Sequence, residues 1–207
     1  MTTATARRTP ADKHDERRRA LADSALRTLG ELGYARASLR EIANNSEFSH
    51  GVVHYYFADK FELIVYCVRY YKARCVTRYD AVVDDSTTPE GLLDAFAAKL
   101  VETLRDEAPM HRLWYDLRTQ SMFESGFRDD VVAIDVSMEA MVWRVVERYG
   151  ELAAREPVVR ADTAYSLIDG LFAKALRDHL AGDPYAPARL GADAARLLPV
   201  LLGDPLR

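Results

Sequence analysis

Apolar side chains recur at helical spacing along nearly the whole of this 207-residue chain, and no stretch shows the sustained alternation of a half-buried strand. The pattern therefore predicts an all-α fold, interrupted at Gly33, Pro157 and Pro184. Because 49% of the residues are hydrophobic, the chain can bury a sizeable core. The expected helices cover residues 15–32, a segment starting at Ser38, and residues 49–56, 60–83, 90–107, 109–122, 128–149, 160–180 and 189–202.

Helix-start signals place two short helices directly after the first one. Ser38 and Glu41 form a capping box, in which the hydroxyl and the carboxylate each bond a free backbone N–H group. Ser49 is a favourable N-cap for the next helix. Two short helices joined by a tight turn and packed on a first helix form a unit that can place its last helix in the DNA major groove. A helix-turn-helix is thus expected at about residues 38–57.

Several polar and small residues of segment 49–60 suit contact with DNA. They are Ser49, His50, Gly51, His54, Tyr55, Tyr56 and Lys60. Histidine rings donate and accept hydrogen bonds, tyrosine hydroxyls reach phosphate oxygens, and a lysine adds positive charge at the start of a helix. Val52 and Val53 could touch thymine methyl groups or pack inward. Aromatic residues are more often core than contact, so composition alone leaves DNA binding open.

Charge is distributed unevenly along the chain. The whole chain has a net charge of −4, but residues 1–60 have a net charge of +2 and the remainder −6. The basic residues near the start are Arg7, Arg8, Lys13, Arg17, Arg18 and Arg19. Such a cluster fits either DNA phosphate contacts or a solvated tail, and charge alone does not decide between them.

Three stretches in order resemble the DNA-binding signature of the TetR family of bacterial transcription regulators. They are Ser38-Leu39-Arg40-Glu41-Ile42-Ala43, Phe48-Ser49-His50-Gly51 and His54-Tyr55-Tyr56-Phe57-Ala58-Asp59-Lys60-Phe61-Glu62-Leu63. The resemblance extends from Ala20 to Leu63 and is far more specific than a lone short motif. The rest of the chain matches only in length and helical content.

The resemblance implies a sequence-specific DNA-binding regulator, most simply a repressor that a small-molecule effector releases from a palindromic operator. It assigns Ser49 to Tyr55 as the recognition helix, with His50, Val52 and Val53 facing base edges. The residues that would hold the DNA backbone are Ser38, His54, Tyr56 and Lys60. The Arg17–Arg19 cluster would lie near phosphate or reach toward the minor groove.

Two positions depart from the family pattern. Ser46-Glu47 stands where the family often has Ala-Gly in the turn, and a left-handed Glu47 would cost roughly 1–2 kcal/mol relative to glycine. Either the turn carries that strain or its geometry differs. His54 stands where tyrosine is common, and the charge of a histidine depends on pH.

The same resemblance implies three parts of the chain and a homodimer. They are a flexible basic arm over residues 1–14, a DNA-binding domain over 15–75, and an effector-binding and dimerisation domain over 76–207. Dimerisation would use the last two helices, because the apolar stripe of segment 160–180 is too wide for one buried face. The expected interface residues are Ala164, Ile168, Leu171, Ala175, Leu197, Leu198 and Leu201.

An effector pocket is expected among the long helices of residues 90–180. Its candidates are polar or aromatic residues within apolar stripes, namely His111, Trp114, Tyr115, Arg118, Trp143, Tyr165, Asp169 and Phe172. Aromatic rings with Asp116 and Asp169 would suit a cationic ligand, whereas Arg118 and His111 would suit an acyl or carboxylate ligand. The sequence leaves both open.

An enzyme and a helical module that binds no DNA are the alternatives. The chain has no nucleophile elbow, phosphate loop or dinucleotide-binding glycines, so neither catalytic residues nor a cofactor are expected. His50 and His54 could hold zinc, but no third ligand stands at an obvious position, so no metal is expected. A module that binds no DNA would show no salt-dependent retention on duplex DNA.

The expected location is the cytoplasm. No apolar run approaches the roughly 18–20 residues that cross a bilayer, so no membrane contact is expected. The first residues lack the apolar core of a signal peptide. Cys67 and Cys75 fall on one expected helix roughly 12 Å apart, too far for a disulfide, which fits a reducing compartment.

Overall fold

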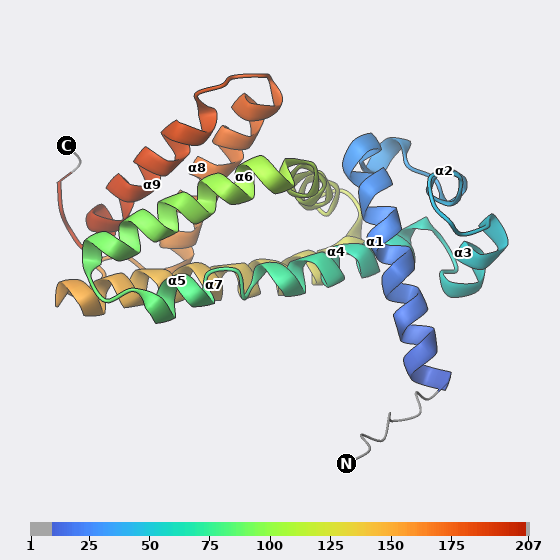
Figure 1. Ribbon diagram of the computed structural model, residues 1–207, viewed down its shortest axis with the longest axis horizontal. Helices are drawn as coiled ribbons and strands as arrows, with labels where there is room; N and C mark the ends of the chain where they lie inside the picture. The colour runs from blue at the N-terminus through green and yellow to red at the C-terminus, as the bar shows by residue number, and fades with distance from the viewer. Residues whose placement is uncertain (1–9, 206–207) are drawn as a thin grey trace, which may run out of the picture. The chain divides into compact units, whose positions relative to one another are not determined.

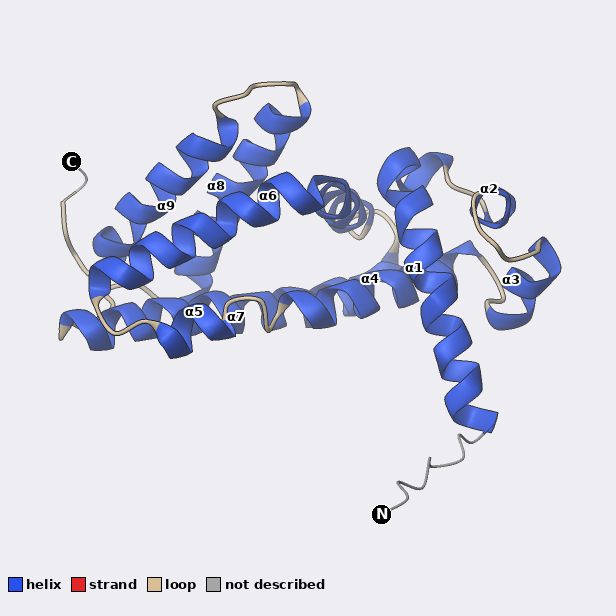
Figure 2. Ribbon diagram, viewed as in Figure 1, coloured by secondary structure: helices blue, strands red, loops and turns tan. Residues whose placement is uncertain are grey.

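The computed structural model describes the backbone of residues 10–205 and the side chains of residues 13–205, and this part of the chain is built from helices and loops (Figures 1 and 2). The α-helices are α1 (Pro10–Arg36), α2 (Leu39–Asn44), α3 (His50–Tyr56), α4 (Lys60–Cys75), α5 (Asp80–Asp85), α6 (Pro89–Gln120), α7 (Arg128–Ala153), α8 (Ala161–Leu180) and α9 (Ala186–Leu201), with a short 3-10 helix at Ser125–Phe127. None of these helices is both long and apolar enough to span a bilayer.

The chain divides into two compact units, Met1–Tyr71 and Lys72–Arg207. The boundary falls inside α4, so this helix contributes residues to both units. The arm expected over residues 1–14 is described only from Pro10, where α1 begins; residues 1–9 lie outside the described residues.

The first unit consists of α1, α2, α3 and most of α4. A stripe on α1, including Leu21, Ala25 and Leu29, is buried, as are Ile42 of α2 and Leu63 of α4. Helix α1 packs on α2, and the Cys67 thiol of α4 donates to the Ala22 carbonyl of α1 over 3.7 Å. Gly33 has a φ of 76° and interrupts the helical geometry of α1, a conformation that glycine adopts without strain. The helix stop expected at Gly33 is therefore confirmed.

The start of α4 is fixed by a variant of the capping box, in which Glu62 bonds the residue before Asp59. The backbone N–H of Glu62 donates to the Asp59 carboxylate over 2.8 Å, and the Glu62 carboxylate accepts from the backbone N–H of Ala58 over 2.9 Å. Glu62 also accepts a hydrogen bond from Arg18 of α1 over 2.8 Å. One carboxylate thus caps α4 and ties it to α1.

The turn between α2 and α3 avoids the strain that a left-handed glutamate would cause. Among the described residues other than glycine, Ala154 alone has a positive φ, so Glu47 is not left-handed. The Ser46 hydroxyl stabilises the turn instead: it donates to the Ala43 carbonyl over 3.0 Å and accepts from the Phe48 N–H over 3.1 Å. Of the two alternatives left by the sequence, a different turn geometry is the correct one.

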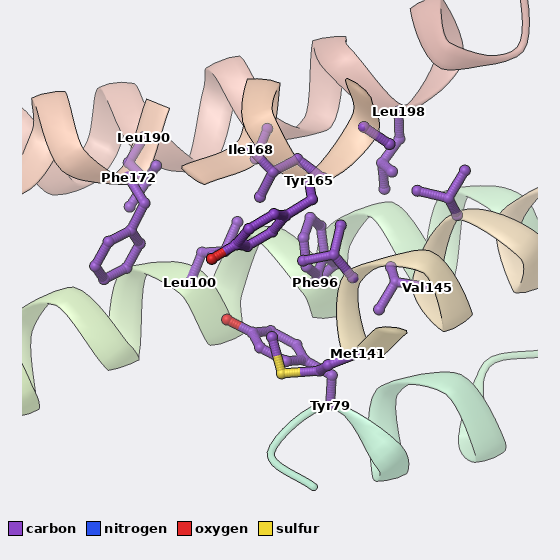
Figure 3. Packing of buried hydrophobic residues seen from close by; sticks show 14 of the residues in the cluster. Tyr79, Phe96, Leu100, Met141, Val145, Tyr165, Ile168, Phe172, Leu190 and Leu198 are labelled. Carbon is purple, nitrogen blue, oxygen red and sulfur yellow. The ribbon is translucent and has the colours of Figure 1, made fainter. Parts of the chain in front are cut away.

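The second unit packs α6, α7, α8 and α9 around one apolar cluster (Figure 3). Helix α6 covers the two segments expected as separate helices, and its helical geometry breaks between them at Glu107, where φ is −126° and ψ is 19°. Pro109 explains the break, because a proline inside a helix lacks an N–H and crowds the carbonyl four residues earlier. Helices α6 and α9 approach closely at Gly191, where a Cβ atom would lie 3.1 Å from Val101 Cγ2.

Five of the residues expected at a dimer interface belong to this core instead. They are Ala164, Ile168, Ala175, Leu198 and Leu201. Leu171 and Leu197 are only half-buried and pack at the edge of the same cluster. The stripe that looked too wide for one buried face is wide because α8 is surrounded by α6, α7 and α9.

A glycine at the end of α7 provides a test of this packing. A Cβ atom on Gly150 would lie 2.7 Å from the Arg155 carbonyl oxygen. Although Gly→Ala within a helix normally stabilises by about 1 kcal/mol, we expect Gly150→Ala to lower the free energy of unfolding by roughly 1–3 kcal/mol. In the control, Gly51→Ala, the added Cβ meets no atom within 4 Å, and this change should be neutral or stabilising. Urea unfolding of both variants measures the difference, and a stabilised Gly150→Ala would contradict the packing.

Candidate functional site

Serine side chains set the beginnings of α2 and α3. Ser38 Oγ accepts a hydrogen bond from the Glu41 N–H over 3.2 Å, and Ser49 Oγ accepts one from the Val52 N–H over 3.4 Å. Each hydroxyl keeps its own proton to donate to a phosphate oxygen. The two caps fix where α2 and α3 begin, and the cap at Ser49 so determines which residues of α3 face outward.

The outward face of α3 is polar and exposed. His50, Gly51, His54 and Tyr55 are all exposed, and 75% of the Tyr55 surface is accessible. The rings of His50 and His54 pack edge to face with centroids 4.5 Å apart. In the described residues, no group of three His, Cys, Asp or Glu side chains forms a metal site around them.

Val52 and Val53 have different environments. Val52 is half-buried on the side of α3 next to the exposed face, whereas Val53 has no accessible surface. The expectation that Val53 faces base edges is therefore wrong; it packs in the core of the first unit. The sequence offered both roles for a valine, and burial selects one.

Tyr56 joins this surface to the start of α1. Its ring lies 4.9 Å from the ring of His14 and 5.0 Å from that of Tyr55, measured between centroids. The sequence did not single out His14 as a site residue, because its proximity arises only when α1 and α3 pack together. These three rings form a small aromatic surface beside the polar face of α3.

The expected basic contacts also have roles in the fold. The Arg17 guanidinium is exposed and stacks on the Phe48 ring, 4.9 Å from its centroid. Arg18 bonds Glu62 and stacks on the Phe57 ring at 4.7 Å, which makes it part of the packing between α1 and α4. Lys60 Nζ donates to the Tyr34 carbonyl over 2.5 Å and lies 4.4 Å from the centroid of the Tyr34 ring.

The second unit encloses a cavity of about 60 Å³ within its helical bundle. Six of the eight expected effector-contact residues line it: His111, Trp114, Tyr115, Tyr165, Asp169 and Phe172. Arg118 is not in the wall but reaches Asp169, and Trp143 packs at the edge of the core. The other wall residues are Lys72, Cys75, Arg78, Tyr79, Phe96, Leu100, Thr103, Met138, Met141, Val142 and Ile168.

One side of the cavity is a network centred on Asp169. Its carboxylate accepts from the Tyr115 hydroxyl over 2.8 Å and from Arg118 Nη1 over 2.8 Å. The Tyr165 hydroxyl donates to Asp135 over 2.7 Å, and Asp135 also lies 3.6 Å from Arg118 Nε. Burial, and then Asp169, raises the pKa of Tyr115, so its hydroxyl remains a donor.

The other side carries two cations that were not predicted. Lys72 is buried, and its Nζ lies 4.6 Å from the centroid of the Trp114 ring. Arg78 pairs with Glu107 over 2.5 Å and lies 3.5 Å from Nε2 of His111. Burial, followed by the charges of Lys72 and Arg78, lowers the pKa of His111 well below its ordinary value, so this ring is neutral at pH 7.

A signal for Lys72 does exist in the sequence. The buried stripe of α4 includes Ile64 and Val68 at helical spacing, and Lys72 follows Val68 by four residues and precedes Cys75 by three. A lysine within such a stripe is either buried or extends its charge out to solvent. Arg78 has no comparable signal, because it lies in the turn between α4 and α5 where one long helix was expected.

Comparison with known proteins identifies relatives of this chain. Residues 21–67 match the family model described as bacterial regulatory proteins, tetR family. The chain is 30% identical over 192 residues to the HTH-type transcriptional regulator BetI of Burkholderia thailandensis, covering 88% of this chain and 93% of that protein.

Solved structures share the fold at lower sequence identity. The transcriptional regulator FadR from Bacillus subtilis, in complex with stearoyl-CoA, has a TM-score of 0.69 and 16% identity, covering 90% of this chain and 99% of that one. A protein from Saccharomonospora viridis in complex with choline has a TM-score of 0.70 and 19% identity, covering 87% of this chain and 94% of that one.

The buried Lys72 predicts a specific pH dependence of stability. Burial lowers its pKa from 10.5 to about 8, so the folded chain releases the Lys72 proton at lower pH than the unfolded chain does. The free energy of unfolding should therefore rise relative to that of Lys72→Met as the pH increases from 8 toward 10. At pH 7 Lys72→Met should be the more stable protein, by up to roughly 3 kcal/mol.

Urea unfolding of both proteins at several pH values measures this difference. The tyrosines of the cavity, whose pKa values are raised, lose their stabilising effect above pH 10 in both proteins and so cancel in the comparison. If the free energies of unfolding of the wild type and Lys72→Met changed in parallel with pH, Lys72 would not be buried as described.

Proposed function

Because this chain belongs to the TetR family of bacterial transcription regulators, we propose that it binds a palindromic operator as a homodimer and represses transcription until a small-molecule effector releases it. DNA binding and transcription regulation come with the family, which is not a family of enzymes. The repressor role, the dimer and the release by an effector are the proposed steps.

The observation that carries DNA recognition is the contrast between the two faces of α3. His50 and His54 are exposed on one face, while Val53 is buried on the other. A helix anchored on one side and polar on the other can enter the major groove, which is about 12 Å wide. His50 and Val52 are proposed to meet base edges. The proposed backbone contacts are Arg17, Ser38, Ser49, Gly51, His54, Tyr55, Tyr56 and Lys60.

The dimer is proposed to use the outward faces of α8 and α9, not the residues first expected. Leu167 of α8 is 44% exposed, and Gly170 beside it is also exposed. The half-buried Leu171 and Leu197, which pack at the edge of the core cluster, are proposed to join them in one apolar surface. A two-fold axis there would present two recognition helices to two half-sites.

Helix α4 is proposed to connect effector binding with DNA release. Its first turns supply Leu63 and Cys67 to the core of the first unit, and its last turn supplies Lys72 and Cys75 to the cavity wall. An effector in the cavity would favour a different position of α4, and so a different separation of the two recognition helices. Operator affinity would fall because the half-sites have a fixed spacing.

The recognition surface is tested with two variants that should fail differently. The operator is first recovered by selecting genomic fragments that bind the protein. His50→Ala should then weaken operator binding by roughly 1–3 kcal/mol while leaving binding to random DNA unchanged, because it removes a base contact. Arg17→Ala should weaken both and reduce the slope of log affinity against log salt by about 0.9 for each lost phosphate contact.

Arg105→Ala is the control for these variants, because Arg105 is an exposed arginine of α6 in the second unit and lies outside the proposed dimer surface on α8 and α9. It should change neither specificity nor salt dependence. If the wild-type protein bound duplex DNA with no dependence on salt, or bound random DNA as tightly as any selected fragment, the proposed function would be wrong.

The dimer surface predicts the effect of a charge on α8. Leu167→Asp should convert dimers to monomers in sedimentation experiments, because an aspartate would be desolvated at the interface. Val136→Asp introduces the same charge at a valine of α7 that is 62% exposed, and it should leave the dimer intact. If both variants disrupted the dimer, or if neither did, the dimer surface would lie elsewhere.

A further inference from the structure

We propose that the cavity of the second unit takes an effector that joins one anionic group, such as a carboxylate, to a short and slender apolar chain. This inference rests on the proposed effector-sensing function and identifies the chemical class that the site recognises. The sequence left cationic and carboxylate ligands equally open, and the arrangement of charges around the cavity distinguishes them.

The charged groups in the cavity wall favour an anion. Lys72 and Arg78 are the two cations, and Asp169 is the one carboxylate among the wall residues of the described chain. Asp169 already accepts hydrogen bonds from Tyr115 and Arg118, so its charge is compensated within the protein. Arg78 pairs with Glu107 over 2.5 Å, so its charge is compensated in the same way. Lys72 is therefore the cation that would repel a cationic ligand and attract an anion.

Two of the aromatic rings in the cavity wall already carry a cation of the protein itself. Lys72 Nζ lies over the Trp114 ring at 4.6 Å from its centroid. The Arg118 guanidinium lies over the same ring at 5.8 Å and over the Tyr115 ring at 5.6 Å. The protein's own cations thus lie against the Trp114 and Tyr115 rings, which a quaternary ammonium would otherwise contact. Asp116, the second acid considered for a cationic ligand, is not in the cavity wall.

The remainder of the wall is apolar and limits the size of the ligand. Phe96, Leu100, Met141 and Ile168 surround the space, and Figure 3 shows Tyr79 and Tyr165 extending toward it, the first from the turn before α5 and the second from α8. A volume of about 60 Å³ is well below the ~150 Å³ of an engineered cavity that admits benzene, so a six-carbon ligand enters only as the wall side chains move apart. Methionine side chains adapt their shape, which allows an unbranched chain to enter more readily than a ring.

Burial of Lys72 supports a role in binding. An ammonium among aromatic and aliphatic side chains weakens the folded state, and its removal is expected to stabilise the protein. A bound carboxylate would recover that loss by pairing with the ammonium, in a low-dielectric environment where such charge-assisted hydrogen bonds are strong. Lys72 also lies on α4, so that pairing acts directly on the helix shared by both units.

The test uses three probes of the same length that differ in charge: hexanoate, hexanamide and hexylammonium. Each is titrated into the full-length protein, and binding is followed by calorimetry and by tryptophan fluorescence, since Trp114 lines the cavity. Hexanoate should bind about tenfold or more tightly than hexanamide, and hexylammonium should bind more weakly than either.

Two variants assign the preference to its residue. Lys72→Met keeps an unbranched side chain without the charge, and it should reduce hexanoate affinity about tenfold while leaving hexanamide affinity unchanged. Lys99→Met, which removes a lysine of α6 that pairs with Glu102 outside the cavity, should bind hexanoate like the wild type. Circular dichroism and thermal melting confirm that Lys72→Met is folded.

Three results would each overturn the inference. Hexylammonium could bind as tightly as hexanoate, or straight-chain carboxylates from butanoate to octanoate could show no saturable binding. Alternatively, Lys72→Met could bind hexanoate with the affinity of the wild type. Operator affinity is measured separately with each probe. Lysine-dependent binding of hexanoate without any change in operator affinity supports the ligand class but contradicts the proposed effector release. Release of the operator by an ammonium probe and not by a carboxylate supports effector release and overturns the ligand class.

Discussion

Helix α4 buries one stripe of its surface along its whole length, and both units of the protein depend on that stripe. Leu63, Ile64 and Cys67 complete the core of the first unit, and Lys72 and Cys75 contribute to the wall of the cavity in the second. The helix is fixed at its start by Asp59 and Glu62 and by the bond between Glu62 and Arg18. A change at one end of a rigid helix cannot be absorbed along it, which suits α4 to link two functions.

The recognition helix and the cavity are built according to different physical rules. In α3, one serine cap and one buried valine fix a short helix so that its polar side chains face outward. In the cavity, charged groups are held inside by mutual bonds, with Asp169 between Tyr115 and Arg118 and with Arg78 beside Glu107. The first arrangement leaves the polar side chains of α3 exposed, where a partner molecule can contact them. The second retains charge in an apolar interior, which lowers stability and favours a ligand of matching charge.

Features governed by local chemistry could be predicted from the sequence. The caps at Ser38 and Ser49 and the interruption at Gly33 follow from rules that involve only neighbouring residues. Features that depend on packing between distant segments could not. Val53 and Val52 look alike in sequence, and the expected dimer stripe of α8 proved to be its core-facing side because three other helices surround it. Most of the expected effector-contact residues do line the cavity, but Arg78 joins them through a turn that interrupts the long helix expected over residues 60–83.

The central claim is that two recognition helices read two half-sites of one duplex and that an effector changes their separation. A spin label attached at Asn44→Cys, an exposed position on α2, measures this directly through the distance between the two labels of a dimer. The native cysteines are buried and should not react. With operator DNA, the account predicts one narrow distribution of distances between the labels, set by half-sites about 34–36 Å apart. That distribution should shift or broaden when a carboxylate that lowers operator affinity is added. The absence of any distance between labels, or an identical distribution with and without that carboxylate, would contradict it.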